Sequence, residues 1–379
     1  MAMRILLDVS AVPDRPVGAG VYTVELARAL AARDDVELHL VSRVGDLDRW
    51  EAIAPAATTH PEAPGPRPAR LAWEQVQAPR FAQRCAIDVW HGPHYTMPLR
   101  LGIPSVVTVH DLTFFDHPEW HERSKVLFFR RMIRESASRA RVLVTVSEFT
   151  ARRLRAVVVP AGEIAVVPHG VDHARFRPAP EPADGAHDHD LLHALGAREP
   201  YLAFAGVFEP RKDLPTLVRA FAAVARRHRH LQLVLAGRDG WGSSAARDAV
   251  ERSRVGSRIL RPGYVAADAL PALFRRAAAV VYPSLEEGFG LPALEAMACG
   301  TPLVSTSGSS IEEVVGPAGV LVPPGDADAL AVAIERVLSD RALAARLRAD
   351  GPERARRYNW EATAAGHLDA YRTAVGVPA

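Results

Sequence analysis

Cysteine, long apolar runs and excess charge of either sign are all scarce in this sequence. Its 379 residues include two cysteines, too few for a disulfide framework, so we expect a protein of the reducing cytoplasm. No apolar run reaches the roughly 18 residues that a membrane-spanning helix needs. The 46 basic and 44 acidic residues nearly cancel, so charge gives no reason to expect a nucleic-acid partner. At about 150 residues per domain, the length predicts two globular domains.

Lysine is the rarest charged residue. Of the 46 basic residues only Lys125 and Lys212 are lysine, and arginine supplies the rest. A compact ammonium and a planar guanidinium serve different chemistry, the first as a point charge and the second as a bidentate donor. In a sequence that uses arginine almost everywhere, the position of each lysine is therefore informative.

Short aliphatic runs alternate with helical segments in both halves of the chain. Strands are expected near residues 4–9, 36–41, 105–109, 141–146, 201–205, 231–236, 279–282 and 302–305. The runs are continuous rather than alternating, which is typical of parallel strands covered on both faces. We therefore predict an α/β fold of two facing Rossmann-like domains, each with a parallel sheet. The cleft between the domains is the expected ligand site.

A segment of different composition separates the two alternating halves. Residues 173–199 are rich in proline, histidine and aspartate and interrupt the periodicity, so they are the expected interdomain linker. This division gives an N-terminal domain at 1–172 and a C-terminal domain at 200–356. The remaining segment, 357–379, is predicted to be a helix that returns to the N-terminal domain.

The densest motif runs from Tyr282 to Gly300. A strand ends near Tyr282, a glycine-bearing loop follows, and a helix is expected to start near Leu291 or Pro292. Proline is tolerated there because the N–H groups of the first turn have no intrahelical partner. The exposed amides of Gly290 and Leu291, together with the helix dipole, form a natural seat for a phosphate.

Two glutamates in the same motif have seven residues between them. Glu287 precedes the expected helix, and Glu295 lies about one turn inside it. Because a carboxylate repels a phosphate, both should face hydroxyl groups at opposite ends of a ligand. A sugar–diphosphate–nucleoside has this order of groups. Either acid alone could be a solvated surface residue, but their combination with Gly288, Phe289 and Gly290 favours a ligand site.

A second motif, at residues 205–214, follows a strand and opens a helix. It contains Arg211 and Lys212, a charged pair that could reach a diphosphate. The alternative is a solvated pair in a loop. The rarity of lysine in this chain argues against that alternative.

These two motifs resemble those of glycosyltransferase family 4, a retaining, sugar-nucleotide-dependent family with the GT-B fold. Four further segments extend the resemblance over nearly the whole chain: 18–22, 108–112, 146–150 and 168–172. The sequence around Trp241, Tyr264 and 309–314 is most similar to the mannosyltransferase-like branch that uses GDP-mannose. The resemblance implies that the N-terminal domain binds the acceptor and the C-terminal domain binds the nucleotide sugar.

The resemblance also implies an activity. The chain would move a hexose, with mannose from GDP-mannose as the expected donor, to a hydroxyl of a glycan, a lipid-linked sugar or a small molecule. The route would be front-side displacement, with no metal and no other cofactor. A UDP-sugar donor on the same fold and a non-catalytic sugar-nucleotide-binding protein stay open as alternatives. A nicotinamide-dependent oxidoreductase is disfavoured, because the glycine loop at 18–20 lacks the later glycine and the ribose-binding acid of that fingerprint.

Four residues would carry the reaction if the family's roles transfer by position. Arg211 and Lys212 would neutralise the donor diphosphate and stabilise the departing nucleotide. Glu287 would hold hydroxyl groups of the donor sugar, and His110 would lie beside the transferring sugar. Six further residues would bind the donor through backbone amides, ribose contact or close approach of the first loop: Gly18, Gly20, Phe289, Gly290, Leu291 and Glu295.

Two positions depart from the family pattern. Val207 stands where many relatives have an arginine that meets the diphosphate, and Arg211 could substitute for it. His169 stands where asparagine is commoner, which could alter hydrogen bonding at the hinge.

The segment from Arg123 to Arg141 combines seven basic residues with apolar ones. A basic amphipathic helix can lie on anionic lipid, so peripheral membrane contact is one hypothesis. The alternative is a helix that packs its apolar side on the sheet and solvates its arginines.

Two weaker patterns suggest metal binding. Asp46 and Asp48 match an acidic metal-binding triplet of another glycosyltransferase fold, but nothing around them supports a site. His187, His189 and His193 have spacing that could bind zinc, although a solvated polar stretch is the favoured interpretation.

Overall fold

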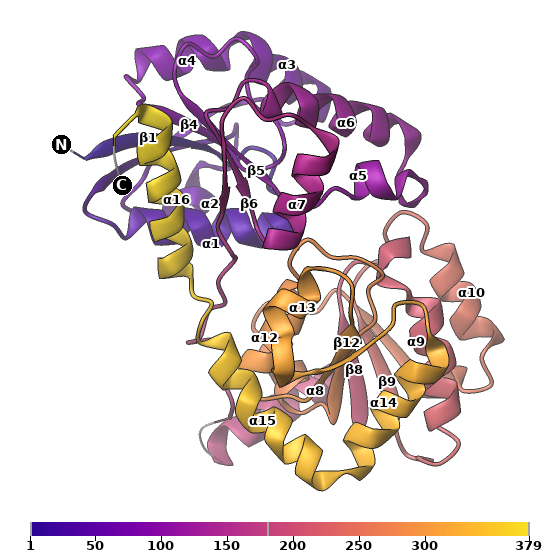
Figure 1. Cartoon of the computed structure of the whole chain (residues 1–379). Helices are drawn as coiled ribbons and strands as arrows, with labels where there is room; N and C mark the ends of the chain where they lie inside the picture. Colours follow the sequence, from indigo (N-terminus) through magenta and orange to yellow (C-terminus); the bar gives the residue numbers. More distant parts are fainter. Residues whose placement is uncertain (1, 180–181, 378–379) are drawn as a thin grey trace. The chain divides into compact units, whose positions relative to one another are not determined.

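The structure is a computed structural model that describes residues 2–179 and 182–377 (Figure 1). Its internal contacts divide the chain into two compact units. The first unit comprises Met1–Pro118, Arg123–Gly170 and Trp360–Ala379, and the second comprises Glu119–Glu122 and Val171–Asn359. None of the helices in the described ranges combines the length and the apolar character that crossing a membrane requires.

The first unit is built on a parallel sheet with the strand order β3-β2-β1-β4-β5-β6-β7. Its strands are β1 (Met3–Asp8), β2 (Val36–Arg43), β3 (Thr58–Ala63), β4 (Val89–Gly92), β5 (Ser105–Val109), β6 (Val142–Thr145) and β7 (Glu163–Val166). Every residue of β4, β5 and β6 is buried. This burial explains the aliphatic runs of β5 and β6, because helices cover both faces of a sheet of this kind.

Most helices of this unit connect consecutive strands, and the last one is the C-terminal helix of the chain. They are α1 (Ala19–Ala31), α2 (Leu47–Ile53), α3 (Arg67–Val76), α4 (Ala78–Arg84), α5 (Thr113–Asp116), α6 (Arg123–Ala137), α7 (Glu148–Val157) and α16 (Trp360–Val375). Two of them, α3 and α4, have a proline in the first turn, where its missing N–H costs no hydrogen bond.

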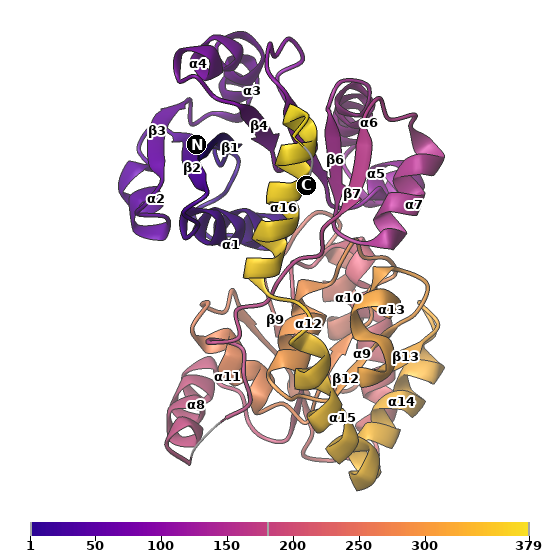
Figure 2. The same ribbon diagram turned by 60° about the vertical axis from the view of Figure 1, so that its left-hand side comes forward.

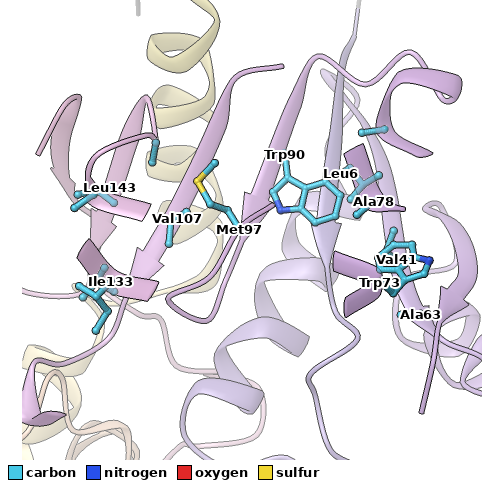
Figure 3. Packing of buried hydrophobic residues seen from close by; sticks show 14 of the residues in the cluster. Leu6, Val41, Ala63, Trp73, Ala78, Trp90, Met97, Val107, Ile133 and Leu143 are labelled. Carbon is cyan, nitrogen blue, oxygen red and sulfur yellow. The ribbon is translucent and has the colours of Figure 1, made fainter. Parts of the chain in front are cut away.

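The core of the first unit lies between the sheet and its helices. Figure 3 shows part of it, with Trp90 of β4 beside Leu6 of β1 and Trp73 of α3 near Val41 of β2. Trp90, Leu6 and Val41 are fully buried. Large side chains of this kind bury the most apolar area per residue, so this cluster stabilises the sheet of the first unit.

The C-terminal helix α16 is part of the first unit. It packs against α1 and against β4, β5 and β6, beside α1 in the view of Figure 2. Gly366 permits a close approach, since a Cβ at this position would lie 2.9 Å from Cγ1 of Val167. The last segment of the sequence therefore contributes side chains to the interior of a unit that begins at the other end of the chain.

The second unit is built on a parallel sheet with the strand order β10-β9-β8-β11-β12-β13. Its strands are β8 (Tyr201–Ala205), β9 (Gln232–Ala236), β10 (Ile259–Gly263), β11 (Ala279–Tyr282), β12 (Leu303–Thr306) and β13 (Val320–Val322). Its helices are α8 (Pro182–Leu195), α9 (Leu214–Val224), α10 (Ser244–Arg252), α11 (Ala269–Arg275), α12 (Leu291–Ala298), α13 (Ser310–Val315), α14 (Ala327–Ser339) and α15 (Arg341–Ala355).

The segment 173–199 differs from the plain linker that its composition predicts, because it contains helix α8, which packs against α11. Asp188 is buried in α8 and accepts two hydrogen bonds from Arg275, at 2.8 and 2.6 Å. Leu192, one turn later, is also buried. Residues four apart lie on the same face of a helix, so Asp188 and Leu192 belong to the side of α8 that is buried.

Candidate active site

The two central strands of the second sheet are β8 and β11, and the chain proceeds from them toward opposite edges of the sheet. From β8 the chain continues to β9 and β10, and from β11 it continues to β12 and β13. In open parallel α/β sheets this reversal of strand order opens a crevice at the carboxyl ends of the strands, where ligands bind. The loops after β8 and β11 are the two that carry the sequence motifs at 205–214 and 282–300.

A buried cluster of charges lies where these loops meet. Nη1 of Arg211 donates a hydrogen bond to Oε2 of Glu287 at 2.6 Å, and Nζ of Lys212 contacts the other carboxylate oxygen. The same Nζ contacts the hydroxyl of Tyr282, which donates to Oε1 of Glu287 at 3.0 Å. The side chains of Lys212 and Glu287 are only 6% and 7% exposed. The structure thus brings together three of the residues that the sequence predicts, and it adds Tyr282.

The backbone around the cluster explains its position. Pro210–Lys212 form a short 3-10 turn, and Asp213, in the left-handed region at φ 45°, caps helix α9 by accepting from Thr216 N–H. The N–H of Leu285 donates to the carbonyl of Arg211 at 2.8 Å, which ties the two loops together. The hydroxyl of Ser310 donates to the carbonyl of Glu287 at 2.7 Å, which ties the backbone of Glu287 to the start of helix α13.

Two cations and two carboxylates set the pKa values of the cluster, because Nε of Arg211 also donates to Oε2 of Glu209 at 3.2 Å. Burial alone would raise the pKa of Glu287, but the charges of Arg211 and Lys212 lower it to about 2. Burial and the like charge of Arg211 lower the pKa of Lys212 to about 8, against the opposing effect of Glu287. With Lys212 protonated, the two cations face one buried carboxylate, Glu287, and one carboxylate that is 35% exposed, Glu209, whose charge the solvent screens. Such a site favours an anion with several oxygens.

The start of helix α12 also depends on a specific backbone conformation. The helix begins at Leu291, as expected, and Gly290 caps it at φ 95°. A Cβ at Gly290 would lie 2.4 Å from Cδ1 of Ile311. Glu295, one turn into the helix, is buried at 7% exposure, and Phe289 packs its ring edge-on against Tyr358 with the centroids 5.8 Å apart.

Replacing Gly290 with alanine should therefore destabilise the protein by about 2–4 kcal/mol, because left-handed strain and overpacking add. Gly308 is a matched control, with φ 84° and no atom within 4 Å of an added Cβ. Gly308→Ala should cost only the strain, about 1–2 kcal/mol. Chemical denaturation of both variants measures the difference, and equal losses would contradict the steric argument.

His110 lies in the first unit, directly after β5. Its Nε2 donates to the carbonyl of Pro93 at 2.8 Å, and the residue is buried at 7% exposure. Burial lowers the pKa of His110, so the imidazole is neutral at pH 7. Since a carbonyl can only accept, Nε2 carries the proton and Nδ1 is left as an acceptor.

The remaining predicted residues are distributed between the units. Gly18, at φ 52°, caps α1 in the first unit, and Gly20 lies in the first turn, where a Cβ would meet Cβ of Pro16 at 3.2 Å. In the second unit Val207 packs so closely that a Cβ on Gly240 would lie 2.7 Å from its Cγ1. In the first unit the ring of His169 lies 4.7 Å from that of Tyr22. Val207 and His169, the two departures from the family pattern, thus each contact residues of the unit to which they belong.

The two segments whose residue patterns were weak indications of metal binding are engaged in other contacts. Asp46 pairs with Arg43 at 2.8 Å, and Asp188, between two of the histidines, pairs with Arg275. Across residues 2–179 and 182–377 there is no group of three or more histidine, cysteine, aspartate or glutamate side chains placed to hold a metal ion.

Fold and site together define a two-domain α/β protein with a cluster of paired charges at the switch point of its second sheet. Residues 16–175 match the family described as Glycosyltransferase Family 4, and residues 193–354 match Glycosyl transferases group 1. The chain is 31% identical to O-antigen chain mannosyltransferase B of Escherichia coli, an alignment that covers 98% of this chain and 100% of that one. The chain belongs to glycosyltransferase family 4 and is a glycosyltransferase of the GT-B fold.

Two further similarities show the breadth of the family. A D-inositol 3-phosphate glycosyltransferase of Salinispora tropica is 30% identical over 94% of this chain and 81% of its own length. The solved Anabaena protein HepE, in complex with UDP and glucose, has the same fold, with a TM-score of 0.77 at 19% identity over 97% of this chain and 99% of that one. The predicted family, fold class and enzyme class are confirmed by these comparisons.

Proposed function

We propose that this glycosyltransferase moves mannose from GDP-mannose to a hydroxyl of a glycan, a lipid-linked sugar or a small molecule, with retention of configuration. The observation that carries the proposal is the buried cluster of Arg211, Lys212 and Glu287. Arg211 and Lys212 would offer two charged donors to a diphosphate, and the Glu287 carboxylate can accept hydrogen bonds from sugar hydroxyls. The name of the Escherichia coli relative supports mannose as the sugar.

The roles of the cluster follow from the bond that breaks. Cleavage of the anomeric C–O bond leaves negative charge on the departing diphosphate, which Arg211 and Lys212 would stabilise without a metal. Backbone N–H groups of Phe289, Gly290 and Leu291 would bind the sugar and phosphate. Glu295 would hold the ribose of the nucleotide.

The proposed route is front-side displacement. The acceptor hydroxyl enters on the face that the diphosphate leaves, and its proton passes to a departing phosphate oxygen. A retaining glycosidase uses instead a carboxylate nucleophile. Nδ1 of His110 is free of the proton and would accept a hydrogen bond from a reacting hydroxyl, which orients that group. Gly18 and Gly20 would let the first loop approach the phosphates.

Titration of the full-length protein with a panel of GDP- and UDP-sugars tests the donor. We expect GDP-mannose to bind with the lowest Kd and to be hydrolysed slowly in the absence of an acceptor. Preference for a UDP-sugar would retain a nucleotide-sugar transferase and overturn the mannosyl assignment. Binding without turnover, with or without acceptor sugars, would favour a non-catalytic donor-binding protein. No binding of any donor would contradict the proposal altogether.

Helix α6 supports a second part of the proposal, peripheral contact of a cytoplasmic protein with anionic lipid. Val126, Met132 and Ile133 are buried, so the apolar side of the helix faces the interior of the first unit. The opposite side leaves Leu127 73% exposed, and Arg123 and Arg131 lie exposed four residues to either side of it. An exposed leucine between two arginines is suited to the surface of an anionic membrane.

Replacing Arg123 and Arg131 with glutamine should weaken binding to anionic liposomes about 30-fold at low salt. Each basic residue near such a surface contributes about 1 kcal/mol, so two contribute about 2 kcal/mol. Arg341 and Arg346, exposed on α15, are the matched control when both are changed to glutamine. Cosedimentation measures the effect. A wild-type protein that stays in the supernatant, or equal losses in both pairs, would exclude this contact.

A further inference from the structure

The first unit contains an unbroken series of buried hydrogen bonds that the proposed mechanism does not use. The hydroxyl of Tyr22 bonds to Thr108 Oγ1 at 2.9 Å and to His367 Nε2 at 2.7 Å. Thr108 Oγ1 bonds to His91 Nε2, and His91 Nδ1 to the hydroxyl of Tyr371, both at 2.8 Å. All five side chains are fully buried, on α1, β5, β4 and α16.

The direction of every bond in this series can be deduced. His367 Nδ1 lies 2.8 Å from the carbonyl of Thr363, which can only accept, so Nδ1 carries the proton. Burial lowers the pKa of His367 to about 4, so the ring is neutral and Nε2 is an acceptor. Burial raises the pKa of Tyr22, which keeps its only proton and donates it to His367.

The same reasoning extends to the other end of the series. Since the Tyr22 proton is committed to His367, the Thr108 hydroxyl must donate to Tyr22. Its own oxygen must then accept from His91 Nε2. Burial lowers the pKa of His91 well below its ordinary value, so its Nδ1 accepts from Tyr371. The proton on His367 therefore determines one orientation for each of the other groups.

Tyr22 connects this series to His110. The Tyr22 ring packs edge-on against the imidazole of His110, with the centroids 4.9 Å apart and an interplanar angle of 79°. The other ring neighbours of His110 are Tyr95, His94 and His169, at 5.7, 5.8 and 5.6 Å. Tyr22 is thus the ring nearest to His110 among these four, and its position depends on hydrogen bonds at its far end.

We propose that His367, on the C-terminal helix, is a positioning residue for transfer. It anchors the Tyr22 hydroxyl, and through the Tyr22 ring it holds the His110 imidazole in the orientation that donates Nε2–H to Pro93 and presents Nδ1. This inference rests on the proposed role of His110. It assigns a function in the reaction to a residue more than 250 positions away in the sequence.

The test compares His367→Leu, which removes the acceptor, with His367→Gln, whose amide oxygen can still accept from Tyr22. In GDP-mannose hydrolysis by the full-length protein, His367→Leu should lower kcat by about tenfold or more, since small misplacement of a reacting group is costly. His367→Gln should recover most of this loss. Tyr22→Phe should match His367→Leu, and the double variant should be no worse than either. KM for the donor should stay within about twofold, because the donor cluster lies in the second unit.

A second readout separates this inference from the proposed function. In protein labelled with ¹⁵N-histidine, His110 resonances are assigned with His110→Asn, and their shifts report which ring nitrogen carries the proton. We expect Nε2–H in the wild type and in His367→Gln, and a mixture of tautomers in His367→Leu and Tyr22→Phe. Unchanged shifts in both disruptive variants would overturn the positioning role, even if the wild type turns over no donor. Wild-type inactivity toward every donor would by itself count against the proposed function only.

One outcome would identify a purely structural role. A residue that only stabilises the fold lowers the melting temperature and leaves kcat unchanged below it, which would overturn the proposal. If His367→Leu does not fold, Tyr22→Phe keeps the test decisive, because it removes one hydroxyl and retains the ring.

Discussion

Replacing Glu287 with glutamine is expected to lower kcat/KM for GDP-mannose by about 10²–10³-fold, the effect of removing a central electrostatic group from an active site. The carboxylate accepts from Arg211, Lys212 and Tyr282 at once. A neutral amide cannot satisfy both cations, and its N–H₂ group would face donors. Binding of GDP, which has no sugar, should be retained, because Arg211 and Lys212, the cations proposed to meet the diphosphate, remain.

Stability should change in the same variant. Removing one partner of a buried ion pair leaves an uncompensated charge and costs about 3–5 kcal/mol. The pH dependence has a defined sign. The pKa of Glu287 is about 2 in the folded protein, below its ordinary 4.5, so its contribution is full above about pH 4.5 and is lost as the pH falls toward 2. The difference in unfolding free energy between wild type and Glu287→Gln should therefore shrink between pH 5 and pH 3.

Glu335→Gln is the matched control for Glu287→Gln. Glu335 also pairs with a basic side chain in the second unit, His228 at 3.2 Å, but it is 26% exposed. An exposed pair of this kind contributes at most about 1 kcal/mol, so turnover should be unchanged and stability nearly so. Steady-state kinetics and urea denaturation measure both variants. Full turnover by Glu287→Gln would contradict a role of Glu287 in the reaction.

The sequence predicted the parts of the molecule that depend on local pattern. Two parallel sheets, the strand at 279–282 and the helix start at Leu291 all follow from aliphatic runs and helix-start signals within a few residues. The charged cluster was predicted in part, because Arg211 and Lys212 belong to one motif and Glu287 to another, and each motif follows a strand. Strands adjacent in a parallel sheet bring the loops after them to one edge.

Tyr282 was a residue of the motif but not a predicted member of the cluster. It is the last residue of β11, a strand of continuous apolar residues, so the sequence pattern does not indicate to which face of the sheet its side chain points. Only the structure shows its hydroxyl between Lys212 and Glu287.

The hydrogen-bond series in the first unit was not predictable from sequence. Tyr22 and His367 are 345 residues apart, and nothing in either local pattern identifies the other as its partner. Helix α8 was missed for a related reason. The partner that offsets the burial of Asp188 is Arg275, which lies 87 residues further along. In both examples the structure depends on a partner that is distant in the sequence, and local composition does not identify that partner.

Lys212→Ala is expected to weaken binding of GDP-mannose and to lower kcat/KM by about 10³-fold, because the charge lost is buried and, in the proposed function, would face the departing diphosphate. Lys125→Ala is the matched control, since it removes the only other lysine, from α6 in the first unit. It should leave donor binding in solution unchanged. Calorimetric titration measures both variants. Wild-type affinity in Lys212→Ala would contradict the diphosphate site.

Lys212→Arg tests why lysine is retained in a chain that otherwise uses arginine. Nζ of Lys212 fits between the Glu287 carboxylate and the Tyr282 hydroxyl, in a position that is almost completely buried. A guanidinium is larger and planar, so it should overpack this space. We expect at least about a tenfold loss of kcat/KM, and normal turnover would show that charge alone matters at this position.

The pH dependence of donor binding gives a further test of the same residue. In the free protein the pKa of Lys212 is about 8, so the ammonium loses its proton above that pH. A bound diphosphate favours the charged form, so binding must take up a proton at higher pH. The Kd for GDP-mannose should therefore rise above pH 8, by up to about tenfold per pH unit, whereas the Kd of Lys212→Ala should stay flat. Because Arg211 keeps its charge over this range, a wild-type profile that is also flat would place the diphosphate on Arg211 and away from Lys212.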